Sequence, residues 1–98
     1  MNVEAMREAA GIAGELIKGL SNPQRLLLLC QLSQGEYRVS QLEVLLDIHQ
    51  PTLPQQLGVL RERELVSTRR EGAQMFYRVA SPQALAVLRL LYQLYCPK

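Results

Sequence analysis

Hydrophobic residues recur at helical spacing at both ends of the chain. Residues 3–20 carry one stripe at alternating three- and four-residue steps, which must pack against the domain or against a partner subunit. The stripe consists of Val3, Met6, Ala10, Ala13, Ile17 and Leu20. Ser81 and Pro82 suit the N-cap and first position of a last helix, residues 82–95. Its apolar face comprises Leu85, Leu88, Leu91, Tyr92 and Tyr95.

Residues 25–32 form a segment with almost no polar face, because they include five leucines and Cys30. Just before it, Ser21 and Gln24 have the spacing of a capping box, in which Ser21 caps the helix and Gln24 reaches back. Gly35 suits the end of this helix. A helix that is apolar on nearly every side is predicted to lie at the centre of the core.

Two short helices joined by a turn are predicted next. Residues 40–43, Ser-Gln-Leu-Glu, form a second capping box that opens a helix through Leu46. Residues 47–50 form the turn, and a further helix runs to about Glu64. That helix places leucines on one face, at positions 53, 57 and 60. Residues 40–64 therefore have the pattern of a helix-turn-helix.

Two prolines disturb the start of the second of these helices. If Gln50 is the N-cap, then Pro51 takes the favoured first position, and Pro54 lacks the N–H that would bond the Gln50 carbonyl. Alternatively, the regular helix begins near Leu53, with Pro54 as its first residue. Both arrangements predict an irregular first turn.

A β-hairpin is predicted over residues 65–80. Residues 65–70 are rich in Val and Thr and alternate in polarity, residues 71–74 form a loop, and residues 75–79 form the return strand. Met75, Tyr77 and Val79 share one side of that strand. A helix-turn-helix followed by a basic hairpin is a winged helix. The predicted fold is mainly α with a β-hairpin wing, in the order α-α-α-α-β-β-α, as a single domain over residues 1–98.

Charge is distributed unevenly between the two halves of the chain. Residues 1–50 carry four Lys/Arg and six Asp/Glu, whereas residues 51–98 carry seven Lys/Arg and three Asp/Glu. The second half therefore provides the candidate face for double-stranded DNA, with side chains suited to base edges and phosphates. The predicted DNA-contacting residues are Gln50, Thr52, Gln55, Gln56, Arg61, Arg69, Arg70 and Gln74.

Several stretches together resemble the ArsR/SmtB-type repressors. They are Leu20 to Cys30, Gln50 to Leu53, Gln56 to Arg61 and Leu65 to Gly72. The resemblance implies a homodimeric winged-helix repressor that binds an inverted-repeat operator until an inducer releases it. It also implies that the two terminal helices, 3–20 and 82–95, build the dimer interface. The interface residues would be Met6, Ala10, Ala13, Ile17, Leu85, Leu88, Leu91, Tyr92 and Tyr95.

The metal ligands of the family's founding members are missing from this sequence. Residues 39–46 contain no Cys or His, and residues 81–95 contain no Asp, Glu or His. His49, Cys30 and Cys96 are too few and too dispersed for a site that needs three or four converging ligands. We therefore expect no metal site and no cofactor, and metal sensing stays as an alternative function.

Cys30 and Cys96 are placed as in a subgroup of sulfide- and redox-responsive repressors of this family. The resemblance implies a dithiol switch, in which persulfide or an oxidant joins the two cysteines and DNA is released. From the residues alone, Cys30 is interpreted as a small buried core residue. Two thiols can form a disulfide only if their Cα atoms approach within about 7 Å.

Other classes of protein fit the sequence poorly. No apolar run approaches the roughly 20 residues of a membrane span, and the charged N-terminus does not resemble a signal peptide, so we expect a cytoplasmic protein. No catalytic arrangement of Ser, His, Asp or Cys is evident, so an enzyme is not expected. A protein-interaction module that has lost specific DNA binding remains a further alternative, and Pro54 in the reading helix supports it.

Overall fold

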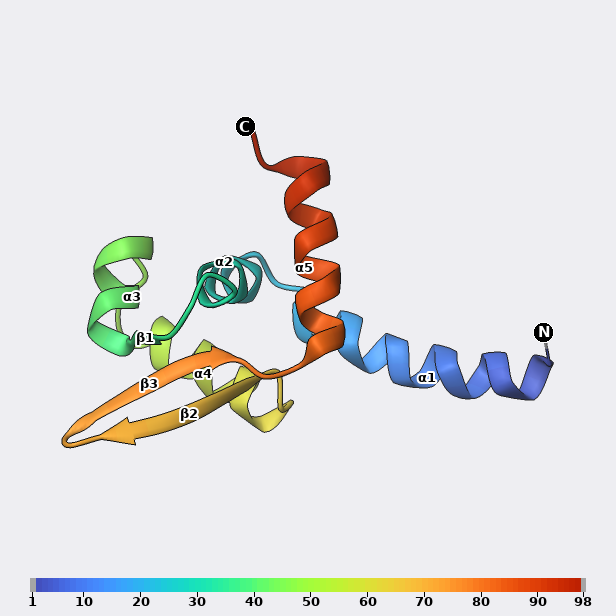
Figure 1. Ribbon diagram of the computed structural model, residues 1–98, viewed down its shortest axis with the longest axis horizontal. Coiled ribbons are helices and arrows are strands. Elements are labelled where there is room, and N and C mark those ends of the chain that lie inside the picture. Colours follow the sequence, from blue (N-terminus) through green and yellow to red (C-terminus); the bar gives the residue numbers. More distant parts are fainter. Residues whose placement is uncertain (1, 98) are drawn as a thin grey trace.

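The computed structural model describes residues 2–97, which form five helices and a small sheet (Figure 1). The elements are α1 (Val3–Leu20), α2 (Pro23–Leu32), β1 (Tyr37–Arg38), α3 (Val39–Leu46), α4 (Thr52–Glu62), β2 (Val66–Glu71), β3 (Gln74–Val79) and α5 (Pro82–Tyr95). This order confirms the predicted winged fold. The predicted bounds of both terminal helices match the structure residue for residue.

The core is a cluster of leucines drawn from every helix, and α2 lies at its centre as predicted. Leu28 and Leu29 of α2 are fully buried, together with Leu42 of α3 and Leu53 and Leu60 of α4. However, α2 is not buried on every side, because its Leu27 is 44% exposed.

The sheet has a third strand that the sequence pattern did not reveal. The strand order is β1-β3-β2, all antiparallel, with Tyr37 opposite Tyr77 in the β1–β3 pair. The hairpin turn is also shorter than predicted, because Glu71 and Gln74 pair across it and only Gly72 and Ala73 remain outside the strands.

Two of the predicted helix caps were assigned to the wrong residue. The N-cap of α2 is Asn22 rather than Ser21, and its Oδ1 accepts from the backbone N–H groups of Gln24 and Arg25 at 2.9 and 3.0 Å. The N-cap of α3 is Arg38 rather than Ser40, and its N–H donates to Gln41 Oε1 at 3.0 Å. The amide oxygen of Asn22 satisfies helix-start N–H groups as well as a serine hydroxyl would.

The start of α4 follows neither of the two predicted arrangements. Pro51 occupies the N-cap position, so Thr52 is the first helical residue and Pro54 the third. The Leu53 N–H donates to the His49 carbonyl at 3.0 Å, and the Gln55 N–H donates to the Pro51 carbonyl at 3.3 Å. Pro54, which has no N–H, falls between them in the turn where helix N–H groups most often lack intrahelical partners. The helix ends at Glu62, two residues earlier than predicted.

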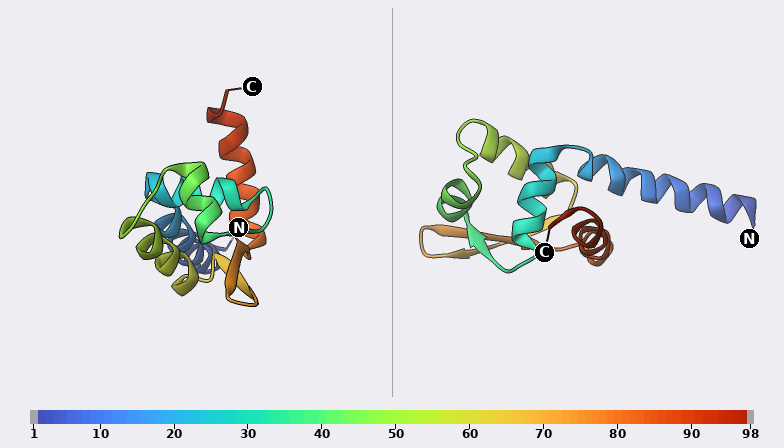
Figure 2. Two further views of the ribbon diagram at one scale, coloured as in Figure 1. Left: turned by 90° about the vertical axis from the view of Figure 1, so that its left-hand side faces the viewer. Right: turned by 90° about the horizontal axis from the view of Figure 1, so that it is seen from above.

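The two terminal helices project from the body of the molecule in different directions (Figures 1 and 2). In α1 only Gly19 and Leu20 are buried, at the end that meets the core. A Cβ at Gly19 would lie 2.6 Å from Leu65 Cδ1, so α1 closely approaches the segment that leads into β2. Within residues 2–97, no helix is long and apolar enough to cross a membrane.

Candidate nucleic-acid interface and thiol pair

Of the predicted DNA-contacting residues, four lie on α4 and Gln50 lies in the turn before it. Gln50, Gln55 and Arg61 are exposed, whereas Thr52 and Gln56 are half-buried. Leu53, Leu57 and Leu60 anchor the opposite face in the core, which confirms the predicted polarity of this helix. The helix therefore presents amides and a guanidinium to solvent, groups that can donate and accept at base edges.

Arg25 of α2 holds one of these residues in place. Its Nη1 donates to Gln56 Oε1 at 3.1 Å, while its Nε and Nη2 donate to the carbonyls of Gly19 and Lys18 at 2.7 and 3.1 Å. One side chain thus connects the end of α1, the start of α2 and the reading helix α4. No local pattern in the sequence indicates this role of Arg25, because its partner on α4 lies 31 residues away.

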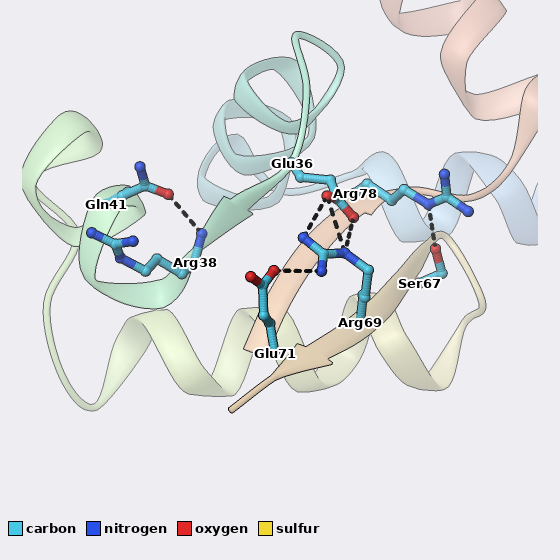
Figure 3. Close-up of polar contacts among 7 residues, drawn as sticks. All are labelled: Glu36, Arg38, Gln41, Ser67, Arg69, Glu71 and Arg78. Atoms are coloured by element: carbon cyan, nitrogen blue, oxygen red, sulfur yellow. Dashed lines mark hydrogen bonds and ion pairs between the residues drawn. The ribbon is translucent and has the colours of Figure 1, made fainter. Parts of the chain in front are cut away.

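Arg69 of the wing lies between two acidic side chains, and its own side chain is 49% exposed (Figure 3). Its guanidinium contacts the Glu36 carboxylate at 3.0 Å and the Glu71 carboxylate at 2.7 Å, and it lies 4.8 Å from the centroid of the Phe76 ring. The hydrogen bonds with Arg69 lower the pKa of Glu36, and those with Glu36 and then Glu71 raise the pKa of Arg69. Glu36 and Arg69 are therefore charged at neutral pH, and each of the three guanidinium nitrogens of Arg69 has a carboxylate partner.

The other polar side chains of the wing make fewer contacts than Arg69 does. Arg70 and Gln74 lie near the tip and are exposed. Arg78 lies nearer the body and donates from Nε to Ser67 Oγ at 3.2 Å. Within residues 2–97, neither Arg61 nor Arg70 forms a side-chain ion pair. These two arginines therefore offer positive charge that no carboxylate of the described chain compensates.

A histidine lies between two carboxylates in the turn before α4. His49 Nε2 is 2.6 Å from Asp47 Oδ1, and His49 Nδ1 is 3.4 Å from Glu43 Oε1. The hydrogen bond with Asp47 and then that with Glu43 raise the pKa of His49. Because a neutral imidazole can donate from only one nitrogen, only the protonated ring can donate to both carboxylates. Among residues 2–97, no three His, Cys, Asp or Glu side chains are grouped to hold a metal ion.

Cys30 lies on α2 and Cys96 directly follows α5, and these two helices pack against each other. Both are free thiols; Cys30 is half-buried and Cys96 is exposed, directly after the end of α5. Burial raises the pKa of Cys30, and the charge of Cys96 raises it further. Cys30 also opens onto a cavity of about 190 Å³. The cavity is lined by Cys30, Ser33, Gln34, Leu88, Arg89, Tyr92 and Gln93.

Apolar side chains on both terminal helices face solvent. Ile17 is 61% exposed, Tyr95 is 79% exposed, and Met6, Ala10, Ala13 and Tyr92 are also exposed. Leu85 and Leu91 are half-buried, whereas Leu88 is only 2% exposed and belongs to the core of the subunit itself. Of the predicted interface residues, Leu88 thus has little surface to offer a partner.

Comparison with known proteins gives a consistent set of relatives. The profile of "Bacterial regulatory protein, arsR family" matches residues 22–68. The biofilm growth-associated repressor of Agrobacterium fabrum is 51% identical over 92 residues, covering 94% of this chain and 79% of that protein. The crystal structure of the transcriptional repressor BigR from Xylella fastidiosa superposes with a TM-score of 0.90 at 45% identity, covering all of both chains.

A third relative is named as an activator. The transcriptional activator HlyU of Vibrio cholerae is 38% identical over 96 residues, covering 98% of this chain and 89% of that protein. Its reduced form superposes with a TM-score of 0.91, covering 97% of this chain and all of the HlyU chain. All these relatives are transcriptional regulators, which confirms both the resemblance and the expectation that the chain is not an enzyme.

Proposed function

This chain belongs to the arsR family of bacterial regulatory proteins, and we propose that it is a homodimeric transcriptional repressor that binds inverted-repeat operator DNA. One observation carries the proposal: the α3–turn–α4 unit presents exposed amides and Arg61 beside a wing with an uncompensated Arg70. Together these groups suit a major groove and the phosphates next to it. Two of the relatives are named as repressors, and this supports repression of transcription as the effect of DNA binding.

The exposed apolar faces of α1 and α5 support the dimer. Fully burying a side chain such as Ile17 contributes about 1.5–3 kcal/mol, so these surfaces favour association with a second copy. A symmetric dimer presents two reading helices, and an inverted repeat presents two half-sites about 34 Å apart. The proposed interface residues are therefore those of the terminal helices, without Leu88.

Cys30 and Cys96 form the proposed inducer switch. With peroxide, one thiolate takes an oxygen atom and releases water, and attack by the other thiol on the resulting sulfenic acid releases a second water and leaves a disulfide. With an organic hydropersulfide, one thiolate takes the outer sulfur and a thiol departs. The other thiolate then attacks the cysteine's own sulfur, and hydrogen sulfide departs. In each case the two cysteines lose two electrons, which the peroxide or the transferred sulfur accepts.

The bridge would connect α2 of the core to the end of α5, an element of the proposed dimer interface. A tether there changes how α5 meets the partner subunit, and thus the spacing of the two reading helices. Because half-site spacing is fixed by the DNA, a small rotation between subunits is sufficient to release the operator.

A gel-shift experiment tests the proposal. The purified protein is titrated against DNA from upstream of its own gene and against random DNA, in the reduced form and after treatment with organic persulfide, glutathione disulfide or peroxide. We expect preferential binding in the reduced form and its loss after persulfide or peroxide, with a Cys30–Cys96 crosslink seen by mass spectrometry. The variant with Cys30→Ser and Cys96→Ser should bind in every condition.

Each part of the proposal can fail separately. Equal affinity for upstream and random DNA would contradict the repressor and favour the interaction-module alternative. Binding that no treatment changes, or a response that survives in the double serine variant, would contradict the thiol switch alone. A zinc-dependent change in affinity would instead support metal sensing.

A further inference from the structure

Neighbouring arginines of the wing point to opposite faces of the sheet. Arg70 pairs with Met75 and therefore shares the face of Tyr77, which is buried beneath the helices. Arg69 pairs with Phe76 and lies on the other face, which carries Ser67, Arg78 and the Glu36 contact. Arg70 thus lies on the side of the sheet that the reading helix occupies, and Arg69 lies on the side away from it.

The surroundings of Arg69 also cancel its charge. Its Nε lies 3.2 Å from Glu36 Oε2 and its Nη2 lies 3.0 Å from Glu36 Oε1, so the guanidinium holds Glu36 with two nitrogens. The third nitrogen, Nη1, donates to Glu71 Oε2 at 2.7 Å. One guanidinium between two carboxylates gives this cluster a formal net charge of −1. A phosphate that approached Arg69 would meet two carboxylates as well.

We propose that Arg69 positions the wing rather than contacting DNA, and that Glu36 and Glu71 keep its charge away from the phosphates. Glu36 directly precedes β1, so its ion pair fastens the hairpin to the segment that leads into α3 of the helix-turn-helix. Phe76 packs against the guanidinium and favours the same side-chain direction. The inference rests on the proposed DNA-binding function and revises one of its predicted contacts.

The salt dependence of DNA binding separates a phosphate contact from a positioning role. Each phosphate that a protein neutralises steepens the plot of log K against log salt concentration by about 0.9. We expect Arg70→Gln to flatten the slope by about 0.9 for each bound wing. Arg69→Gln should weaken binding at every salt concentration and leave the slope unchanged, because it removes a support and no phosphate contact.

Removing both carboxylates around Arg69 should change the salt dependence in the direction opposite to that of Arg70→Gln. In the double variant Glu36→Gln and Glu71→Gln, Arg69 is freed from both carboxylates and becomes available to the DNA backbone. We expect a slope steeper by up to about 0.9 for each wing. Binding at high salt should be weaker than that of the wild type, because this variant also lacks the Glu36 ion pair that supports the wing. Glu8→Gln on α1 is the control for a change of charge away from the wing, and its slope should match the wild type.

Four results decide the outcome. A slope that flattens as much in Arg69→Gln as in Arg70→Gln would overturn the inference, as would an unchanged or flatter slope in the double glutamine variant. Thermal unfolding of each variant identifies any that fails to fold, in which case the remaining variants decide. Absence of specific binding by the wild type would contradict the proposed function itself. Unchanged slope in Arg69→Gln with a steeper slope in the double variant supports the inference.

Discussion

The reading unit, residues 23–79, buries most of its leucines within the subunit, whereas the terminal helices α1 and α5 leave much of their apolar surface in solvent. Both regions have hydrophobic residues at helical spacing. Leu28 and Leu53 of the reading unit are fully buried, but Ile17 and Tyr95 of the terminal helices are more than half exposed. The spacing thus defines an apolar face on each helix without defining what covers that face. For α1 and α5, we propose that a second subunit covers it.

The largest effect is expected in the reading unit. Leu28→Ala leaves a cavity in the fully buried centre of the core, so we expect the free energy of unfolding to fall by about 2–5 kcal/mol. Urea unfolding followed by circular dichroism measures the change. Leu45→Ala, at a 56% exposed position of α3, is the control and should change it by less than about 0.5 kcal/mol. Equal effects at the two positions would contradict the assigned core.

A smaller effect is expected at the terminal helices, and it should depend on protein concentration. Ile17→Asn places an amide on the proposed interface, so we expect the dimer dissociation constant to rise roughly 10- to 100-fold. Sedimentation velocity over a dilution series measures it. Val44→Asn alters an 83% exposed apolar residue of the reading unit and should leave the dimer unchanged. If Val44→Asn weakened the dimer and Ile17→Asn did not, the interface would lie on α3.

The sequence predicted those features of the structure that depend on residues close to one another along the chain. Ser81 and Pro82 gave the start of α5 because both act within one turn of helix. The strand β1 was missed because two residues have no period, and its existence depends on pairing with Tyr77 and Phe76 far along the chain. The Arg69–Glu36 pair was missed for the same reason, since the partners are 33 residues apart. Arg69 was therefore predicted as a DNA contact from its type alone.

Two asparagine caps, one at the start of the reading unit and one at the start of α1, provide a finer comparison. Asn22 caps α2 in the reading unit, and Asn2 caps α1, with Oδ1 2.7 Å from the Glu4 backbone nitrogen. We expect Asn22→Ala to lower the free energy of unfolding by about 1 kcal/mol, because α2 cannot lose its first turn without disturbing the core. Asn2→Ala should fray the exposed end of α1 and leave global unfolding nearly unchanged, since little packs there. Urea unfolding measures the first effect and amide hydrogen exchange the second. A larger effect at Asn2 would mean that the start of α1 is packed in solution.

The smallest effect is expected at His49, in the turn that leads into the reading helix. Asp47 and then Glu43 raise the pKa of His49 in the folded protein above its ordinary value of 6.5. A raised pKa means that folding favours the protonated ring. The stabilisation is therefore fully present below about pH 6.5 and disappears as the pH rises through the folded-state pKa. His49→Gln keeps a polar side chain that cannot titrate, so the difference in melting temperature between wild type and variant should shrink from pH 5.5 to 8.5. A difference that stays constant, or grows, across that range would mean that the imidazolium does not bridge the two carboxylates. The terminal helices carry no histidine, so a pH-dependent difference of this kind reports on the reading unit alone.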